Sequence, residues 1–249
     1  MVKGVNYFFV NVFIVLVLYS VANFAYPSKE MKVQQENTPP KVKIVLPENK
    51  GIYELNTPIQ YEISVSDVED GESKFQEISS NEVFLQVKYL PDESKVSAEL
   101  NQAVKSDSPG LAGIKASNCL NCHAFNTKLI GPSFYEIGKR YPLTKVNLDL
   151  MVKRIREGST GVWGNITMPT HTELTREETQ EMATWILKNG TEPDVNYYRG
   201  TEGSFKIKSP VAAKGKGLFV LTASYTDHGL KDKPKQNLRG QDIIMIQGK

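Results

Sequence analysis

The sequence predicts an α+β chain of more than one domain, in which a helical block lies between two β segments. Its 249 residues exceed the length of one compact domain, which averages about 100 to 200 residues. Apolar residues alternate at a period of two before residue 91 and after residue 196, and they recur at helical spacing between residues 108 and 190. A formal net charge of +2 gives no indication of nucleic acid as a partner.

The chain begins with an uncharged apolar stretch after Lys3. The run "YFFVNVFIVLVLYSVA" ends in small residues, so cleavage after Ala22 or Ala25 would suit a secretory signal peptide over residues 1–25. The alternative is an uncleaved membrane anchor over residues 4–25, because a charge-free run of this length approaches that of a spanning helix. Both alternatives predict export and a periplasmic location.

Alternating apolar residues predict three strands in each β segment. In residues 39–90 the strand patterns are "KVKIVL", "IQYEISVS" and "VFLQVKYL". Residues 91–107 are charged and rich in serine, which is typical of a linker. In residues 196–249 the patterns are "GSFKIK", "GLFVLTASY" and "LRGQDIIMIQG".

Four helices are expected within residues 108–190. The first begins at Pro109, and the second lies in "GPSFYEIGKRYP", which ends on a proline. "NLDLMVKRIREG" predicts a third helix with Asn147 as its N-cap. "LTREETQEMATWILKNG" predicts a fourth, which opens on a capping box of Thr175 and Glu178.

Both cysteines of the chain lie in "NCLNCHAF", residues 118–125. Cys-x-x-Cys-His is the attachment signature of a c-type haem: each thiol adds to a vinyl group of the porphyrin, and the histidine faces the iron. Cys119 and Cys122 are therefore the candidate thioether residues, and His123 is the candidate fifth ligand. Three alternatives are a thioredoxin-like dithiol, a disulfide, and a zinc site, for which the two other histidines lack ligand-type spacing.

The sixth iron ligand decides the chemistry of such a haem. A thioether or imidazole in the far axial position makes a low-spin electron carrier, whereas an open position suits oxygen-handling or peroxidatic chemistry. Met168 lies in the loop sequence "GVWGNITMPTH" and is the best candidate. Met151 and Met182 lie on apolar helical stripes, where core packing is the expected role. The predicted metal ligands are His123 and Met168.

Residues 108–190 resemble the small bacterial class I cytochromes c of the periplasm. The resemblance runs through "GLAGIKASNCLNCHAF", "KLIGPSF", "LMVKRIREGSTGVWGNITMP" and "LTREETQEMATWIL", in the order and spacing of that family, and covers about a third of the chain. It implies the all-α class I cytochrome c fold, one covalent haem c with its iron, and transfer of one electron without a catalytic residue.

The same resemblance implies roles for residues around the haem. Pro132 would accept a hydrogen bond from the ring of His123, and Arg154 and Trp163 would donate to a haem propionate. Where such relatives often have an asparagine three residues after the methionine, this chain has His171. It is expected as an exposed loop histidine; the alternatives are a residue that tunes the potential with pH, or an iron ligand in place of the methionine.

The segment "VSDVEDGE" resembles the acidic strand-to-turn segment of PKD-like and other immunoglobulin-like modules of secreted proteins. Its side chains either ligate calcium or form a solvated turn. The four carboxylates concerned are Asp67, Glu69, Asp70 and Glu72.

Each β segment alone has too few strands for an immunoglobulin-like sandwich, which has about seven. In class I cytochromes c the first and last helices cross, at positions like Gly110 and Trp185 here, so the two ends of the domain emerge close together. That geometry suits insertion into another domain. We expect residues 39–90 and 196–249 to form one sandwich with the cytochrome inserted; two separate β modules are the alternative.

The sequence therefore predicts an exported electron-transfer protein, not an enzyme. Its expected partners are periplasmic or membrane redox proteins, namely a dehydrogenase donor and an oxidase or reductase acceptor. The alternative function is a secreted binding or adhesion module whose haem senses redox state or ligands.

Overall fold

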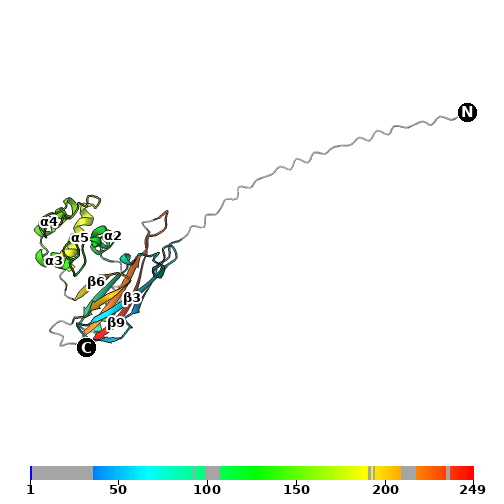
Figure 1. The fold of residues 1–249 in the computed structure, drawn as a ribbon, viewed down its shortest axis with the longest axis horizontal. Helices are drawn as coiled ribbons and strands as arrows, with labels where there is room; N and C mark the ends of the chain where they lie inside the picture. Colours follow the sequence, from blue (N-terminus) through cyan, green and yellow to red (C-terminus); the bar gives the residue numbers. More distant parts are fainter. Residues whose placement is uncertain are drawn as a thin grey trace. The chain divides into compact units, whose positions relative to one another are not determined.

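The computed structural model of this chain describes residue 1 and residues 36–91, 93–98, 107–189, 192, 194–208, 217–233 and 236–249 (Figure 1). The expected signal peptide or anchor, residues 1–25, lies outside the described residues from residue 2 onward. Within the described part, no helix has both the length and the apolar character needed to cross a membrane. Glu36–Lys249 form one compact unit.

The described strands form two β sheets, and both sheets contain strands from before and after the helical block. In the four-stranded sheet, β3 (Pro58–Asp67) pairs with β1 (Lys41–Leu46), β4 (Gly71–Glu72) and β7 (Glu202–Lys206). The five-stranded sheet has the order β2 (Ile52–Tyr53), β9 (Arg239–Gly248), β8 (Gly217–Thr226), β5 (Phe84–Leu90) and β6 (Val195–Arg199).

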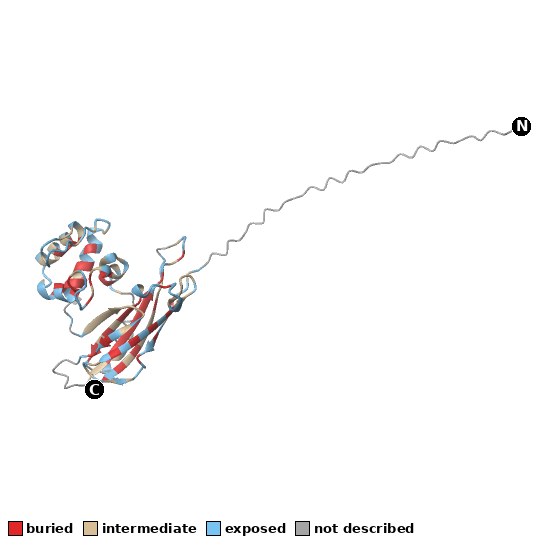
Figure 2. Cartoon of the chain, viewed as in Figure 1, coloured by how far each residue is buried: buried red, intermediate tan, exposed pale blue. Residues whose placement is uncertain are grey.

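Strands far apart in the sequence pair because neither β segment has enough strands to bury its apolar face alone. Ile59 of β3 lies opposite Phe205 of β7, and Leu85 of β5 lies opposite Ala223 of β8. Buried and exposed residues alternate along β3, as its period of two predicts (Figure 2). The buried faces of both sheets form one core cluster, so the sheets pack face to face as a sandwich.

Some described structure is not predicted by the sequence patterns, and β6 and a helix in the expected linker are examples. β6 has the sequence VNYYR. Every residue in it is half-buried, so burial does not alternate along this strand. Within the expected linker, residues 91–107, Glu93–Lys95 form a short 3-10 helix (η3).

Four α helices lie within residues 107–189: α2 (Pro109–Ala116), α3 (Phe134–Arg140), α4 (Lys145–Glu157) and α5 (Arg176–Asn189). The prediction of Asn147 as the N-cap of α4 is wrong. Thr144 caps this helix, because its hydroxyl accepts a hydrogen bond from the backbone N–H of Asn147. The capping box of α5 is confirmed: Thr175 and Glu178 each accept the backbone N–H of the other.

Helices α2 and α5 cross at Gly110. A Cβ atom at this position would overlap the carbonyl oxygen of Glu181 and would lie only 2.8 Å from the Cβ of Trp185. Glycine therefore allows the two helix backbones to approach closely, and the start of α2 is held against the middle of α5.

The helical block packs directly on β5 and β6. Phe84 of β5 is 6% exposed and belongs to the core of the helical block. Lys115 Nζ lies 4.5 Å from the centroid of the Phe84 ring and 2.9 Å from the carboxylate of Asp107. Tyr197 of β6 contacts Phe125, with ring centroids 5.0 Å apart. We call these five residues the junction.

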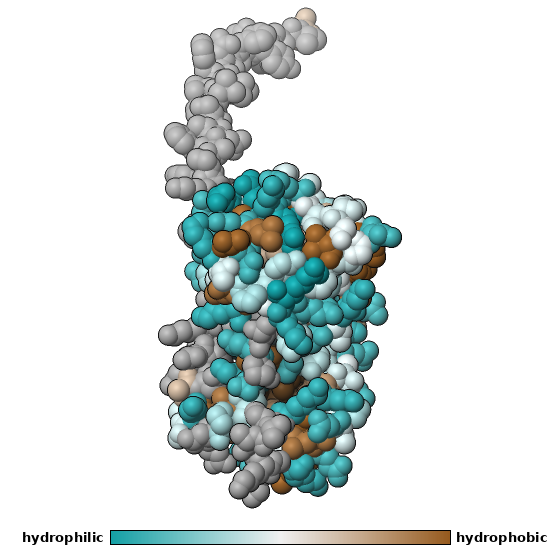
Figure 3. Space-filling view, turned by 90° about the vertical axis from the view of Figure 1, so that its left-hand side faces the viewer, coloured by the Kyte–Doolittle hydropathy of each residue, from teal (hydrophilic) through white to brown (hydrophobic). Residues whose placement is uncertain are grey.

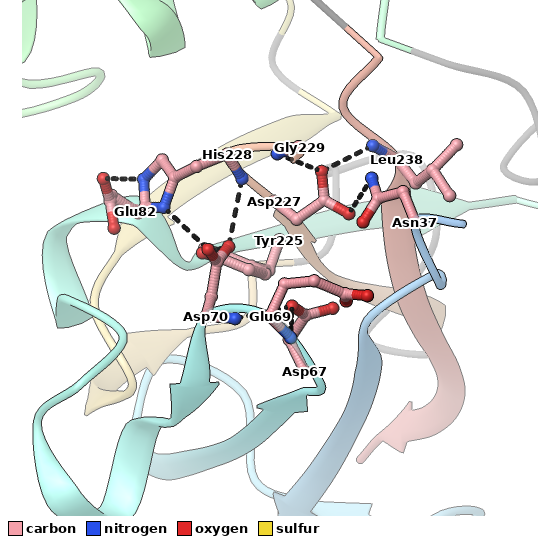
Figure 4. A network of polar contacts seen from close by, with 10 residues as sticks. All are labelled: Asn37, Asp67, Glu69, Asp70, Glu82, Tyr225, Asp227, His228, Gly229 and Leu238. Atoms are coloured by element: carbon pink, nitrogen blue, oxygen red, sulfur yellow. Dashed lines mark hydrogen bonds and ion pairs between the residues drawn. The ribbon is translucent and has the colours of Figure 1, made fainter. Parts of the chain in front are cut away.

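A polar network links the turn after β3 to the residues that follow β8 (Figure 4). Asp70 accepts hydrogen bonds from the hydroxyl of Tyr225 at 2.7 Å and from the backbone N–H of His228 at 3.0 Å. The ring of His228 bridges two carboxylates, because Nδ1 lies 3.2 Å from Asp70 and Nε2 lies 3.0 Å from Glu82.

The acidic turn that the sequence offers as a calcium candidate makes contacts within the protein. Asp67 accepts the backbone N–H groups of Glu69 and Asp70, and Glu72 pairs with Lys74 at 2.6 Å. Among the described residues there is no cluster of three or more His, Cys, Asp or Glu side chains that could hold a metal ion.

Replacing Phe84 tests the junction. Phe84→Ala removes a buried ring from the core of the helical block, so we expect the free energy of unfolding to fall by about 3–5 kcal/mol. Phe75→Ala is the matched control because this ring is 65% exposed, and its effect should stay within about 0.5 kcal/mol. Urea unfolding of both variants measures the difference; equal effects would contradict a packed junction.

The bridge made by His228 predicts a pH-dependent stability. The pKa of His228 is raised above its ordinary value, chiefly by the hydrogen bond to Glu82 and further by the charge of Asp70. The folded chain then binds this proton more tightly than the unfolded chain does. The stabilisation is therefore complete below the unfolded pKa of about 6.5 and is lost as pH rises through the folded pKa.

We expect the urea midpoint of the wild type to exceed that of His228→Gln by more at about pH 5.5 than at about pH 9. Comparing the two proteins at each pH cancels the contributions of the other titrating groups. A difference that is constant over this range would show that the ring does not couple its proton to folding.

Candidate haem site

The two cysteines and His123 are brought together by one tight turn. Residues Asn118–Asn121 form a 3-10 helix, η4, and the carbonyl of Cys119 accepts the backbone N–H groups of Cys122 at 3.2 Å and of His123 at 2.9 Å. The thiols are not joined in a disulfide, and burial raises the pKa of the Cys119 thiol. Both thiols and the imidazole line the same cavity.

This cavity lies among α3, α4, α5, the attachment turn, the loop before α3 and the loop after α4. The space not filled by atoms is about 1050 Å³, the open region at the cavity mouth included. Its walls are mostly apolar, and Ile130 and Ile166 at its rim are exposed. In Figure 3, apolar residues reach the surface in separate groups among hydrophilic ones. The buried apolar lining consists of Phe134, Ile137, Met151, Ile155, Met182 and Ile186.

His123 is held in one orientation from three sides. Its Nδ1–H donates to the carbonyl of Pro132 at 2.6 Å, which leaves the lone pair on Nε2. The ring of Phe134 stacks on the imidazole at 5.5 Å and 14°, and a Cβ on Gly131 would lie 2.6 Å from its Cε1 atom. Burial lowers the pKa of His123 and so favours the neutral form that binds metal ions.

Met168 lines the cavity from a loop that is pinned to the end of α4. Its backbone N–H donates to the carbonyl of Ser159 at 2.8 Å, and the N–H of Ser159 donates back to the carbonyl of Met168 at 3.1 Å. Gly158 adopts φ 81°, and a Cβ there would lie 2.8 Å from the Met168 carbonyl oxygen. The close bridge therefore depends on glycine at the helix end.

Arg154 and Trp163 also line the cavity. Arg154 Nη1 is buried and has no hydrogen-bond partner among the described residues, while the guanidinium lies 5.2 Å from the centroid of Tyr141. Trp163 is covered on one face by Arg140, whose Cζ lies 4.5 Å from the ring centroid. A buried donor without an acceptor is costly, so Arg154 is suited to an anionic group that enters the cavity.

His171 lies in a loop, as expected, but it is only partly exposed rather than exposed. Its side chain is only 12% exposed, and its Nδ1 lies 2.9 Å from the carboxylate of Glu173. Its backbone N–H donates to the carbonyl of Ile155. His171 is not among the residues that line the cavity, whereas Met168 is.

The cavity residues fit a haem. Two thiols stand in one turn beside a neutral imidazole, apolar side chains cover the interior, and the unpaired donor of Arg154 offers a place for a propionate. Gly131 and Tyr141 also contact residues of the site, and neither is predicted from the sequence. The glycine directly before Pro132 was the available signal for the first, and no pattern pointed to the second.

Comparisons with known proteins concern the helical block. Residues 110–190 match the family model for cytochrome c. Cytochrome c-552 of Hydrogenobacter thermophilus is 35% identical over 86 residues, which cover 31% of this chain and 87% of that protein. Cytochrome c-551 of Pseudomonas aeruginosa is 34% identical over 73 residues, covering 29% and 69%.

Among solved structures, wild-type cytochrome c552 of Nitrosomonas europaea aligns with a TM-score of 0.30 and 32% identity, over 31% of this chain and 96% of that one. The sequence relatives are small proteins that the helical block covers over most of their length. The chain therefore belongs to the cytochrome c family, whose members bind haem c covalently and transfer electrons through the haem iron.

Proposed function

We propose that this chain is an exported cytochrome that carries one electron between redox partners through a single haem. Cys119 and Cys122 would hold the porphyrin through thioether bonds, and His123 and Met168 would ligate its iron. The observation that carries the proposal is that all of the candidate site residues line one cavity. They are Cys119, Cys122, His123, Pro132, Arg154, Trp163 and Met168.

The residues of the site have separable tasks. The haem, when bound, supplies one-electron redox chemistry at its iron. Pro132 keeps the proton of His123 on Nδ1, so that Nε2 presents its lone pair to the cavity. Arg154 offers its unpaired donor to a propionate. The apolar walls would exclude water, and the thioether of Met168 would favour ferrous iron when haem is bound.

Docking to redox partners is proposed to use transient contacts near the cavity mouth. The exposed lysines on α4 are partly neutralised, because Lys145 pairs with Asp149 at 2.8 Å and Lys153 lies 3.8 Å from Glu157. Charge steering from this helix is therefore weaker than its sequence suggests. Expected partners are a dehydrogenase donor and an oxidase or reductase acceptor of the periplasm or its membrane.

The β part is proposed to be a single PKD-like or immunoglobulin-like sandwich, formed by residues 39–90 and 196–249, with the cytochrome of residues 108–190 inserted. The pairing of β3 with β7 and of β5 with β8 supports this division. The sandwich would present the haem to its partners. Export through a signal peptide over residues 1–25 is part of the same proposal.

The first test concerns covalent attachment. Because the chain has two cysteines, the double variant Cys119→Ala with Cys122→Ala can form no thioether, whereas each single variant can form one. After maturation with the haem-attachment machinery, we expect haem staining on a denaturing gel for the wild type and both single variants, and none for the double variant. A wild-type band without stain would refute the proposal.

The second test concerns the axial methionine. Met168→Ala should lose the weak near-infrared sulfur-to-iron band of the oxidised protein and should lower the reduction potential, because a thioether favours ferrous iron. Met245→Ala, which changes a methionine of β9 in the sandwich, is the control and should keep both. Reduced wild type that binds carbon monoxide would instead indicate an open axial position and a ligand sensor.

A further inference from the structure

An arginine of the β sandwich contacts the turn between the two cysteines. Arg199 is the last residue of β6, and its Nη1 donates a hydrogen bond of 2.9 Å to the carbonyl of Leu120. Its Nε donates to the carbonyl of Asn81, next to the start of β5. One guanidinium therefore connects the sandwich to the peptide that separates Cys119 from Cys122.

The hydrogen bond from Arg199 satisfies a backbone carbonyl of the turn. Leu120 lies in the last turn of η4, where backbone carbonyls lose their helical partners. Its side chain is 5% exposed, so the turn is packed against the core rather than open to water. Arg199 is half-buried, and this burial lowers its pKa. A charge–dipole contact is stronger at a half-buried position than in water.

A second connection runs from β6 to the axial histidine through aromatic rings. Tyr197 contacts Phe125 at 5.0 Å, and Phe125 contacts Phe134 at 5.7 Å. Phe134 in turn stacks on His123 at 5.5 Å. Tyr197 and Arg199 are two residues apart on one strand, so β6 supports the attachment turn by a hydrogen bond and the imidazole by packing.

We propose that Arg199 is a positioning residue for the haem-attachment turn, and that through it the β sandwich sets the geometry and the reduction potential of the bound haem. This inference rests on haem attachment at Cys119 and Cys122, as proposed above. The hydrogen bond restricts opening of the turn. The positive charge disfavours ferric iron, which carries one more positive charge than ferrous iron, and so raises the potential.

The test uses the full-length, haem-loaded chain with three variants. Arg199→Gln removes the charge and the forked donor. Arg199→Lys keeps the charge but replaces the fork by a single ammonium group. Lys206→Gln is the control: it makes the same change in net charge at an exposed position of β7. Two quantities are measured, the equilibrium reduction potential and the hydrogen exchange of the peptide that contains Cys122 and His123.

We expect Arg199→Gln to lower the potential and to speed amide exchange in this peptide by about ten-fold or more, the size that loss of one charged hydrogen bond implies. Arg199→Lys should speed exchange while keeping the potential closer to the wild type. Lys206→Gln should change neither quantity. If Arg199→Gln does not accumulate, faster exchange in Arg199→Lys supports the proposal, and exchange equal to the wild type overturns it.

Equal potentials and equal exchange in Arg199→Gln and Lys206→Gln would also overturn the positioning role. In that case wild type that stains for haem leaves the proposed function intact. Wild type without covalent haem would refute the proposed function instead. The exchange comparison would then still decide whether Arg199 holds the turn.

Discussion

The hydrogen bond from His123 Nδ1 to the carbonyl of Pro132 is the constraint on which the site depends. It selects one tautomer and therefore one nitrogen that can face the cavity. Its surroundings support that choice: Gly131 leaves room for the ring, Phe134 stacks on it, and burial lowers the pKa of the imidazole. Without this arrangement, two thiols in a turn would define a place for a porphyrin but not the orientation of its ligand.

The rest of the cavity wall is apolar except for a few polar groups. Its lining is mostly apolar, so that a buried imidazole and a thioether face little competition from water. The unpaired donor of Arg154 is the exception, since an unsatisfied buried donor costs free energy unless an anion completes it. The Ser159–Met168 bridge at the end of α4 holds the opposite wall, which keeps a loop methionine on the cavity.

The sandwich and the helical block depend on one another for burial. Phe84 belongs by sequence to a strand of the sandwich, yet it lies in the helical core. Tyr197 and Arg199 of β6 contact the aromatic core and the attachment turn of the same block. β6 is an edge strand of the five-stranded sheet, and the ring of Tyr197 packs against Trp185 of α5, with ring centroids 5.5 Å apart.

Local patterns determined much of this protein in advance. Alternation placed β1, β3, β5 and β8, helical spacing placed α2 to α5, and the Cys-x-x-Cys-His run named the attachment residues, because each of these signals lies within a few consecutive residues. Only the tertiary structure decided the position of β6, the partial burial of His171 and the contact of Arg199 with Leu120. Apolar and polar residues do not alternate in VNYYR because every residue of β6 is half-buried. Arg199 and Leu120 are 79 residues apart, so no short sequence pattern predicts their contact. The N-cap of α4 could be located from the sequence only to within one turn. Thr144 and Asn147 are both of residue types that cap helices, and the backbone geometry places the cap at Thr144.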